Sequence, residues 1–159
     1  MIPTSHLNDA MLLDADGKIH LYEITLSTGL NLYAKRFTSG TWQGKTYGVM
    51  EIVMSEVKRN SDGEAARPTL QMLNPEGLFT LSVLNGDWDM APVIRRTVLR
   101  THFETNVGIA VVERWFISRV TQCDHNSIAF ELRSPADRMN ALIPVRTFSP
   151  PDFPFVNLR

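Results

Sequence analysis

The sequence predicts a mainly β domain, a sandwich or flattened barrel with one or two short helices. Most apolar residues fall in short runs rich in valine, isoleucine, threonine and aromatic side chains, and turn-forming residues separate these runs. Only two stretches carry helix start signals. The length of 159 residues suits one compact domain, and 43% hydrophobic residues are enough for a folded core.

The first predicted strands form two hairpins. Residues 18–26 and 30–35 flank a glycine-containing turn and make the first hairpin. In the second, Gly44-Lys45 is a two-residue loop whose glycine suits the first position of a type II′ turn. Residues 47–54 then predict one strand with alternating faces. The front half of the chain is therefore expected to hold two hairpins and a further strand.

A loop and a short helix follow. Residues 58–67 are polar and rich in turn formers, which predicts a solvated loop that a neighbouring molecule orders. After a short strand at 68–73, Asn74-Pro75 supplies an N-cap and a proline at the first helical position, and Asn85-Gly86 supplies the stop. The predicted helix of about three turns carries one apolar stripe, formed by Leu78, Leu81 and Leu84.

The back half returns to strands, predicted at 93–103, 109–123 and 127–133. Residues 134–137 (Ser-Pro-Ala-Asp) then start a second compact helix, which Pro144 ends. Residues 147–159 mix prolines with Phe148, Phe153 and Phe155 and cannot join a central strand. We therefore divide the chain into a β domain, residues 1–146, and an extended C-terminal arm, residues 147–159.

Charge and cysteine content narrow the function classes. The net charge of −1 gives no overall case for binding nucleic acid or anionic lipid. Residues 1–94 carry 7 basic and 11 acidic side chains, whereas residues 95–146 carry 8 arginines and 5 acidic side chains, an asymmetry that favours a protein partner or self-association. The single cysteine excludes an intramolecular disulfide and an all-cysteine metal site. Without a signal peptide or an apolar membrane span, the protein is expected in the cytoplasm until it is assembled.

Candidate catalytic groups do not form a recognisable site. His102 and Glu104 make an i,i+2 pair that would share a strand face, but they lack further ligands at metal-binding spacing. Cys123 lies beside His125 at a strand end, where neighbouring side chains point to opposite faces. The acidic set Asp87, Asp89 and Glu104 is interpreted as loop caps and solvated positions. The sequence therefore predicts no catalytic residues, no metal and no cofactor.

Arginines are the candidate contact residues. Arg95, Arg96 and Arg100 fall in the predicted strand 93–103, with Arg96 and Arg100 on one face and Arg95 on the other, and Arg114 lies in the next strand. Arginine on a strand face can pair with carboxylates of a neighbouring subunit, or it can be an ordinary solvated position. The candidate subunit interface consists of Arg95, Arg96, Arg100, Arg114, Phe153 and Phe155.

Five motifs in order resemble one protein family. These are a W-Q-G-x-x-Y hairpin at 42–47, an R-P-T strand at 67–69, a V-x-R-R-x-V strand at 93–98, a W-x-I strand at 115–117 and an S-P-x-D turn at 134–137. In this series, which extends over about residues 20–146, the chain resembles the N-terminal domain of the minor tail protein L family of long-tailed bacteriophages. Each motif alone is weak, and the five in register are specific.

The resemblance implies a non-enzymatic virion protein of the tail tip or baseplate with a tail-tube-like β-sandwich or barrel. It implies a ring of several copies, a trimer first and a hexamer as the alternative, between the tail tube or distal tail protein and the central hub or host-recognition fibre. DNA is then only cargo passing through the lumen. The cysteine-rich extension that the family uses for an iron–sulfur cluster has no counterpart here, so no cofactor is carried over.

Three alternatives stay open at this point. The chain could be a distal tail or tube-terminating ring protein of the same fold, and such rings are usually sixfold. It could be a small β-scaffold hydrolase or metal enzyme, if His102, Glu104, Cys123 and His125 converged in a pocket. It could also be a separate binding module with no place in a virion.

Overall fold

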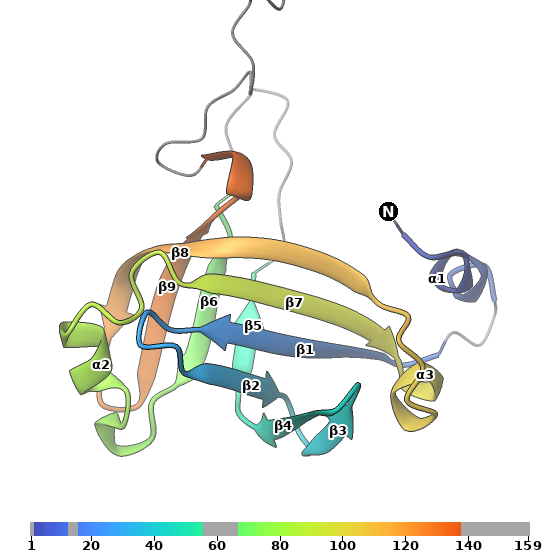
Figure 1. Cartoon of the computed structure of the whole chain (residues 1–159), viewed down its shortest axis with the longest axis horizontal. Coiled ribbons are helices and arrows are strands. Elements are labelled where there is room, and N and C mark those ends of the chain that lie inside the picture. Colours follow the sequence, from blue (N-terminus) through green and yellow to red (C-terminus); the bar gives the residue numbers. More distant parts are fainter. Residues whose placement is uncertain (1, 13–15, 56–66, 138–159) are drawn as a thin grey trace, which may run out of the picture.

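The structure, a computed structural model, describes residues 2–12, 16–55 and 67–137, which form a mainly β domain as predicted (Figure 1). The strands are β1 (Lys18–Thr25), β2 (Asn31–Lys35), β3 (Gly40–Trp42), β4 (Lys45–Val49), β5 (Ile52–Met54), β6 (Thr69–Leu73), β7 (Pro92–Leu99), β8 (Val111–Cys123) and β9 (Ser127–Arg133). The helices are α1 (Thr4–Asp9), α2 (Thr80–Leu84) and α3 (Arg100–Glu104), with 3-10 turns η1 (Pro75–Gly77) and η2 (Pro135–Asp137).

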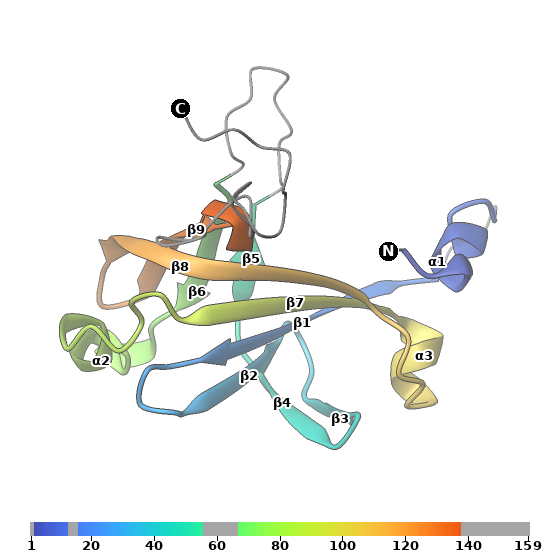
Figure 2. The same cartoon turned by 45° about the horizontal axis from the view of Figure 1, so that its top comes forward.

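The described strands make one sheet in the order β3-β4-β2-β1-β7-β8-β9-β6-β5, and this sheet bends on itself. Strands β2, β1 and β7 run along the long axis, whereas β9, β6 and β5 run across it in both views (Figures 1 and 2). The pairing of β8 with β9 shifts register twice, between Ile117 and Arg119 and between Val120 and Gln122. Such irregularities bend a strand and increase its twist, which brings the two limbs of the sheet face to face.

The chain itself closes the two limbs. Strands β4 and β5 are separated by Met50 and Glu51 only, yet they lie toward opposite ends of the strand order. Met50 N–H donates to the Lys35 carbonyl at the end of β2, and Leu73 N–H in β6 donates to the Glu51 carbonyl, each at 3.0 Å. A two-residue connection spans roughly 10 Å at most. The sheet is therefore forced into a nearly closed, barrel-like curl.

A large apolar core fills the space between the limbs. Trp88, which is completely buried, stacks on Phe130 of β9 with ring centroids 5.0 Å apart, and Phe79 meets Trp88 edge-on at 5.7 Å. Around them lie inward-facing residues of β1, β5, β6, β7, β8 and β9, among them Ile24, Ile52, Leu70, Val93, Ile117 and Leu132. This core holds the bent sheet together.

A smaller cluster lies on the other face of the first limb. Leu21 of β1 and Val98 of β7 pack against Trp42 and Tyr47 of the β3–β4 hairpin. The Trp42 indole N–H also donates to the Val107 carbonyl at 3.1 Å. The hairpin therefore covers part of the outer face of β1 and β7, and residues 21–24 of β1 are buried on both faces of the sheet.

The predicted strand 93–103 is wrong at its C-terminal end. Strand β7 ends at Leu99, and α3 begins at Arg100. Asp16 causes the change: its carboxylate accepts the Thr101 backbone N–H at 2.9 Å and the Thr101 hydroxyl at 2.5 Å. These bonds satisfy donors of the first helical turn. Arg100 therefore does not share a strand face with Arg96.

The predicted hairpin loop is displaced by one residue. Trp42 pairs with Lys45, so the loop residues are Gln43 and Gly44, both with positive φ (50° and 75°). Two positive φ values fit a type I′ turn instead of type II′. The Gln43 backbone N–H donates to the Asn106 side chain at 2.7 Å and its amide donates to the Asn106 carbonyl at 2.6 Å. This distant anchor holds a non-glycine residue in a left-handed conformation.

Two further predictions need correction. Residues 47–54 form not one strand but the ends of β4 and β5, because the chain crosses between the limbs at Met50. The predicted helix over 74–85 is interrupted at Glu76 (φ 55°) and splits into η1 and α2. Helix α1 was not predicted at all. The loop at 58–66, the helix end at Pro144 and the arm 147–159 lie outside the described residues.

None of the helices in the part of the chain that the structure describes is long and apolar enough to cross a membrane.

We expect the core to respond strongly to loss of volume. Leu132→Ala empties a site with no solvent exposure and should lower the free energy of unfolding by about 2–5 kcal/mol. The matched control Leu81→Ala removes the same atoms from a side chain that is 70% exposed and should change it by less than about 0.5 kcal/mol. Urea unfolding of both variants measures the difference, and equal losses would contradict the assigned core.

Candidate functional site

A buried carboxylate joins three strands on the outer face of the first limb. Glu23 of β1 accepts hydrogen bonds from Lys45 Nζ at 2.8 Å, from the Tyr47 hydroxyl at 2.7 Å and from Arg96 Nε at 2.7 Å. Strand pairing explains the convergence, because β1 lies between β7 and β2 and β4 pairs with β2. All three donors bind this one side chain, so the cluster attaches the β3–β4 hairpin to β1 and β7.

The electrostatics of the cluster favour the ionised carboxylate. Burial of Glu23 opposes ionisation, but the hydrogen bonds from Arg96, Lys45 and Tyr47 outweigh it and lower the pKa of Glu23. Burial and the bond to Glu23 raise the pKa of the Tyr47 hydroxyl, which therefore stays protonated and donating. One carboxylate faces two cations here. This arrangement holds a structure in place and leaves no free base for chemistry.

The predicted interface arginines have different environments. Arg96 is bound to Glu23, and Arg95 forms an ion pair with Glu113 of the neighbouring strand at 2.5 Å. Arg100 starts α3 and is exposed, and Arg114 is exposed on β8. Two of the four therefore have carboxylate partners within the chain. Phe153 and Phe155 lie outside the described residues.

The candidate catalytic groups do not converge in the described residues. His102 and Glu104 lie on helix α3, where an i,i+2 pair points in different directions. The His102 ring instead lies 6.1 Å from the His6 ring of α1. Cys123 and His125 are both exposed at the β8–β9 turn. The acidic set is also split, because Asp87 and Asp89 follow α2 whereas Glu104 is at the α3 end (Figure 1). Among the described residues, no three such side chains are placed to hold a metal ion.

A basic cavity opens where β1, β2 and β5 meet. Its volume is about 600 Å³, and its lining includes Lys18, Lys35, Arg36, Arg95 and Arg100 and no carboxylate of the described residues. Alternation along β1 directs every second side chain, from Lys18 onward, to this face. The positive field can attract an anionic side chain or ligand. We call this region the basic mouth.

Phe37 stands at the rim of the basic mouth. It has a positive φ of 71°, which is unfavourable for a bulky residue, and its side chain is 77% exposed. The Arg36 guanidinium lies 4.8 Å from its ring centroid and is ion-paired with Glu51. Backbone strain combined with apolar exposure is typical of a contact residue.

The end of the molecule that carries α2 presents an apolar face. Leu78, Leu81 and Leu84, the stripe predicted for this helix, are 69%, 70% and 77% exposed. The core contacts come instead from Phe79, Val83 and Trp88, whose indole N–H donates to the Ser82 hydroxyl at 2.8 Å. The helix is thus held by one set of side chains and presents another set to solvent.

Asn74 fixes this end to the sheet. Its side-chain oxygen accepts the Phe79 N–H at 2.9 Å, and its amide donates to the Thr80 hydroxyl at 2.9 Å and to the Asp124 carbonyl at 2.8 Å. The residue is completely buried. The sequence predicted Asn74 as a helix cap, but it did not predict the bond to the β8–β9 turn, because that contact joins residues 50 positions apart.

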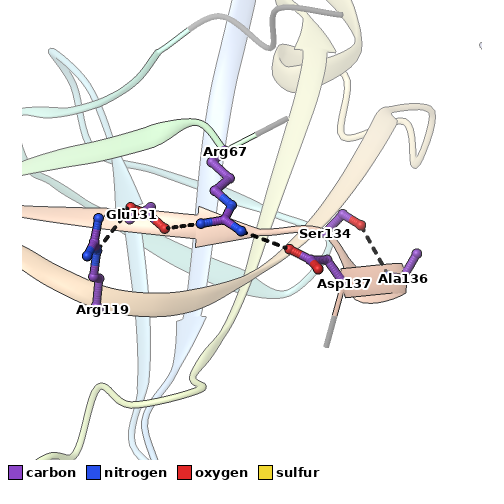
Figure 3. Close-up of polar contacts among 6 residues, drawn as sticks. All are labelled: Arg67, Arg119, Glu131, Ser134, Ala136 and Asp137. Carbon is purple, nitrogen blue, oxygen red and sulfur yellow. Dashed lines mark hydrogen bonds and ion pairs between the residues drawn. The ribbon is translucent and has the colours of Figure 1, made fainter. Parts of the chain in front are cut away.

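A third cluster holds the S-P-A-D turn (Figure 3). Glu131 of β9 accepts from Arg119 Nη2 at 2.7 Å and from Arg67 Nη1 at 3.4 Å. Arg67 also lies 3.9 Å from Asp137, while the Ser134 hydroxyl accepts the Ala136 N–H at 3.1 Å. The cluster therefore joins Arg67, which directly follows residues 56–66, to Asp137, the last described residue.

Glu23 is the important residue that sequence reasoning missed. It lies in a run of strand residues, and nothing in its neighbours marks it as buried. The available signal was the Arg95-Arg96 pair in a strand that is otherwise apolar, since a cation in a central strand needs a carboxylate across the sheet.

The chain is similar to one protein family, one related protein and one solved structure. Residues 28–152 match the family model described as phage minor tail protein L. Tail tip protein L of Escherichia phage lambda is 28% identical over 117 residues, which cover 67% of this chain and 50% of that protein. A chain in the virion of a native gene transfer agent (GTA) particle is similar in fold, with a TM-score of 0.69 at 13% identity over 87% of this chain and 47% of the other. The chain thus spans about half the length of these relatives.

We expect removal of the Glu23 charge to weaken the fold. Glu23→Gln leaves Lys45 and Arg96 without their counter-charge in a partly buried site and should lower the free energy of unfolding by about 2–3 kcal/mol at pH 7. The control Glu104→Gln changes an exposed carboxylate and should have an effect below about 0.5 kcal/mol. Denaturant unfolding of both variants checks this, and indistinguishable stabilities would refute the role of Glu23.

The same cluster predicts the acid response. The pKa of Glu23 is lower in the folded chain than its unfolded value of about 4.3, so its stabilisation is complete above that value and is lost as the pH falls through the folded pKa. The stability of the wild-type chain should therefore decrease more steeply between about pH 5 and pH 2 than that of Glu23→Gln. Parallel curves would show that Glu23 does not contribute to acid unfolding.

Proposed function

Because the chain belongs to the phage minor tail protein L family, we propose that it is a non-enzymatic structural subunit of the phage tail tip. In this proposal several copies form a ring, a trimer, that joins the end of the tail tube to the central hub or host-recognition fibre. The tail tube or distal tail protein lies on one side, the fibre on the other, and DNA passes through the lumen as cargo. The chain is made in the host cytoplasm and becomes part of the virion on assembly.

The observation that carries the proposal is the family match over residues 28–152. In the fold, several residues of the family motifs attach one strand to another. The motif tyrosine Tyr47 and the motif arginine Arg96 meet at Glu23, and the motif arginine Arg67 meets Glu131. These polar groups are used to fix strands to one another. A rigid subunit that presents surfaces to neighbours needs this arrangement.

The surface of the domain also supports assembly. Leucines on α2 and Phe37 at the basic mouth are largely exposed in the isolated chain. Exposed apolar groups that lie together are typical of protein contact sites. Burying them against partners would stabilise an assembled tail tip.

Location and copy number in the particle test the proposal. We expect a tagged copy of the chain to appear at the tail tip in electron micrographs, and a reconstruction of the tip to show three copies around the tail axis. A phage with an early stop codon in this coding sequence should produce filled heads without functional tails. Six copies at the tube end would support the distal tail alternative, and absence from purified tails would contradict a structural role.

We expect the C-terminal arm to act in assembly and not in folding of the domain. Deleting residues 147–159 should leave the urea unfolding of the body unchanged within about 0.5 kcal/mol, because the residues of the described core all lie between Tyr22 and Leu132. The same deletion should abolish incorporation into tails, and Phe153→Ala with Phe155→Ala should weaken it more than the control Asn157→Ala. Normal tail assembly by the truncated chain would reject this role.

A further inference from the structure

One end of the domain is acidic as well as apolar. The exposed leucines on α2 (Leu81 and Leu84) and just before it (Leu78) are flanked by the exposed carboxylates of Glu76, Asp89 and Asp124. The sequence contains no lysine or arginine between Arg67 and Arg95, so no cation of this segment offsets them. We call this surface, formed by Leu78, Leu81, Leu84, Glu76, Asp89 and Asp124, the α2 end.

The α2 end is rigid in spite of its exposure. The buried Trp88 and Asn74 hold α2 to β9 and to the β8–β9 turn through the stacking and hydrogen bonds described above. A preordered surface loses little conformational entropy when it binds. The leucines are therefore presented as a fixed apolar ridge with acidic flanks.

The basic mouth has the complementary properties. Neither Lys18 nor Arg100 forms an ion pair with a described carboxylate, although Asp16 lies close enough to Arg100 for that cation to help lower the pKa of Asp16. Phe37 adds an exposed apolar group at the rim, and Ile52 and Met54 line the interior. Arg36 and Arg95 are ion-paired with Glu51 and Glu113, so among the described residues the mouth combines the unpaired charges of Lys18 and Arg100 with apolar surface.

The α2 end and two cations of the basic mouth, Lys18 and Arg100, lie toward different ends of the molecule. Helix α2 is at one end of the long axis, whereas Lys18 begins β1 and Arg100 begins α3 near the other end, in both views (Figures 1 and 2). Two copies that met through like surfaces would oppose carboxylate to carboxylate or cation to cation, which is unfavourable. A head-to-tail contact pairs opposite charges and covers apolar groups on both sides.

We propose that the α2 end of one copy docks on the basic mouth of the next copy, and that this head-to-tail contact builds the ring. The inference rests on the proposed function and specifies which surfaces form the subunit interface. Carboxylates of Glu76, Asp89 and Asp124 lie against Lys18 and Arg100 of the neighbour, and the α2 leucines cover Phe37. A heterologous contact of this kind closes into a ring when its rotation returns to the start.

The single cysteine supplies a direct test. Cys123 is exposed and lies in the β8–β9 turn beside the α2 end. Val53→Cys places a second thiol at an exposed position that lines the basic mouth. With a short bismaleimide crosslinker, the purified Val53→Cys chain should give dimers, trimers and a closed ring, because each copy then carries one thiol on each side of the contact.

Matched controls identify the contact. Wild type has one thiol and can give at most dimers, and Thr46→Cys places its second thiol on the exposed hairpin surface away from the mouth. Val53→Cys combined with Cys123→Ser also has one thiol, and it should give no crosslinked dimer, because the head-to-tail contact does not bring two basic mouths together. Efficient dimer formation by either one-thiol chain, or equal products from Thr46→Cys and Val53→Cys, would overturn the proposed pairing.

Mixing two variants, each defective in one of the two surfaces, tests whether the contact is head-to-tail. Leu81→Glu damages only the α2 end, and Lys18→Glu with Arg100→Glu damages only the basic mouth. Each variant alone should associate on the order of tenfold or more weakly than wild type in sedimentation experiments. Their mixture should form a 1:1 heterodimer and nothing larger, since one intact α2 end and one intact mouth remain. Unimpaired self-association of either variant, or no heterodimer in the mixture, would contradict the contact.

Two readouts separate this inference from the proposed function. Cooperative urea unfolding of each variant shows that the chain still folds, because the changed side chains are exposed. The crosslinking of the Val53→Cys chain is then repeated in purified tails. A chain present at the tail tip without a crosslink from position 53 of one copy to Cys123 of the next would refute the interface alone, whereas a chain absent from tails would refute the function.

Discussion

The closure of the sheet by Met50 and Glu51 is the constraint on which the rest of the structure depends. Because this connection is so short, the last strands of the sheet must lie against the first ones. The bulges of β8 provide the bend, and the Trp88–Phe130 stack fills the enclosed volume. A flat nine-stranded sheet would leave that volume exposed to water. Core, curvature and connectivity therefore support one another.

The polar groups follow from the same geometry. Strands buried on both faces cannot keep a charged side chain unless an opposite charge is supplied nearby. Glu23 meets this need for Arg96 and Lys45 and fixes the hairpin that carries Tyr47. The residues that resemble the family motifs are therefore explained by strand attachment, and their order along the chain reflects which strands become neighbours.

Two exposed surfaces of the domain, the α2 end and the basic mouth, differ in charge. The α2 end combines leucines with carboxylates, whereas the basic mouth combines cations with Phe37. Asn74 and Trp88 hold the α2 end, and the pairing of β1 with β2 and β7 holds the basic mouth. A rigid body with complementary ends can take part in ordered assembly without changing shape, which suits a component of a phage tail.

The sequence by itself determined the mainly β class, most strand positions and the α2 leucine stripe, because these depend on local propensity and periodicity. It also carried the family motifs. Only the tertiary structure decided that β7 ends and α3 begins at Arg100, that β4 and β5 pair with different parts of the sheet, and that Glu23 binds Arg96. Each of these depends on residues far apart in the chain, such as Asp16 and Thr101, whose contacts exist only after the strands have paired. Sequence patterns record local preference: the Arg95-Arg96 pair indicates that a counter-charge is needed, but not which distant residue supplies it.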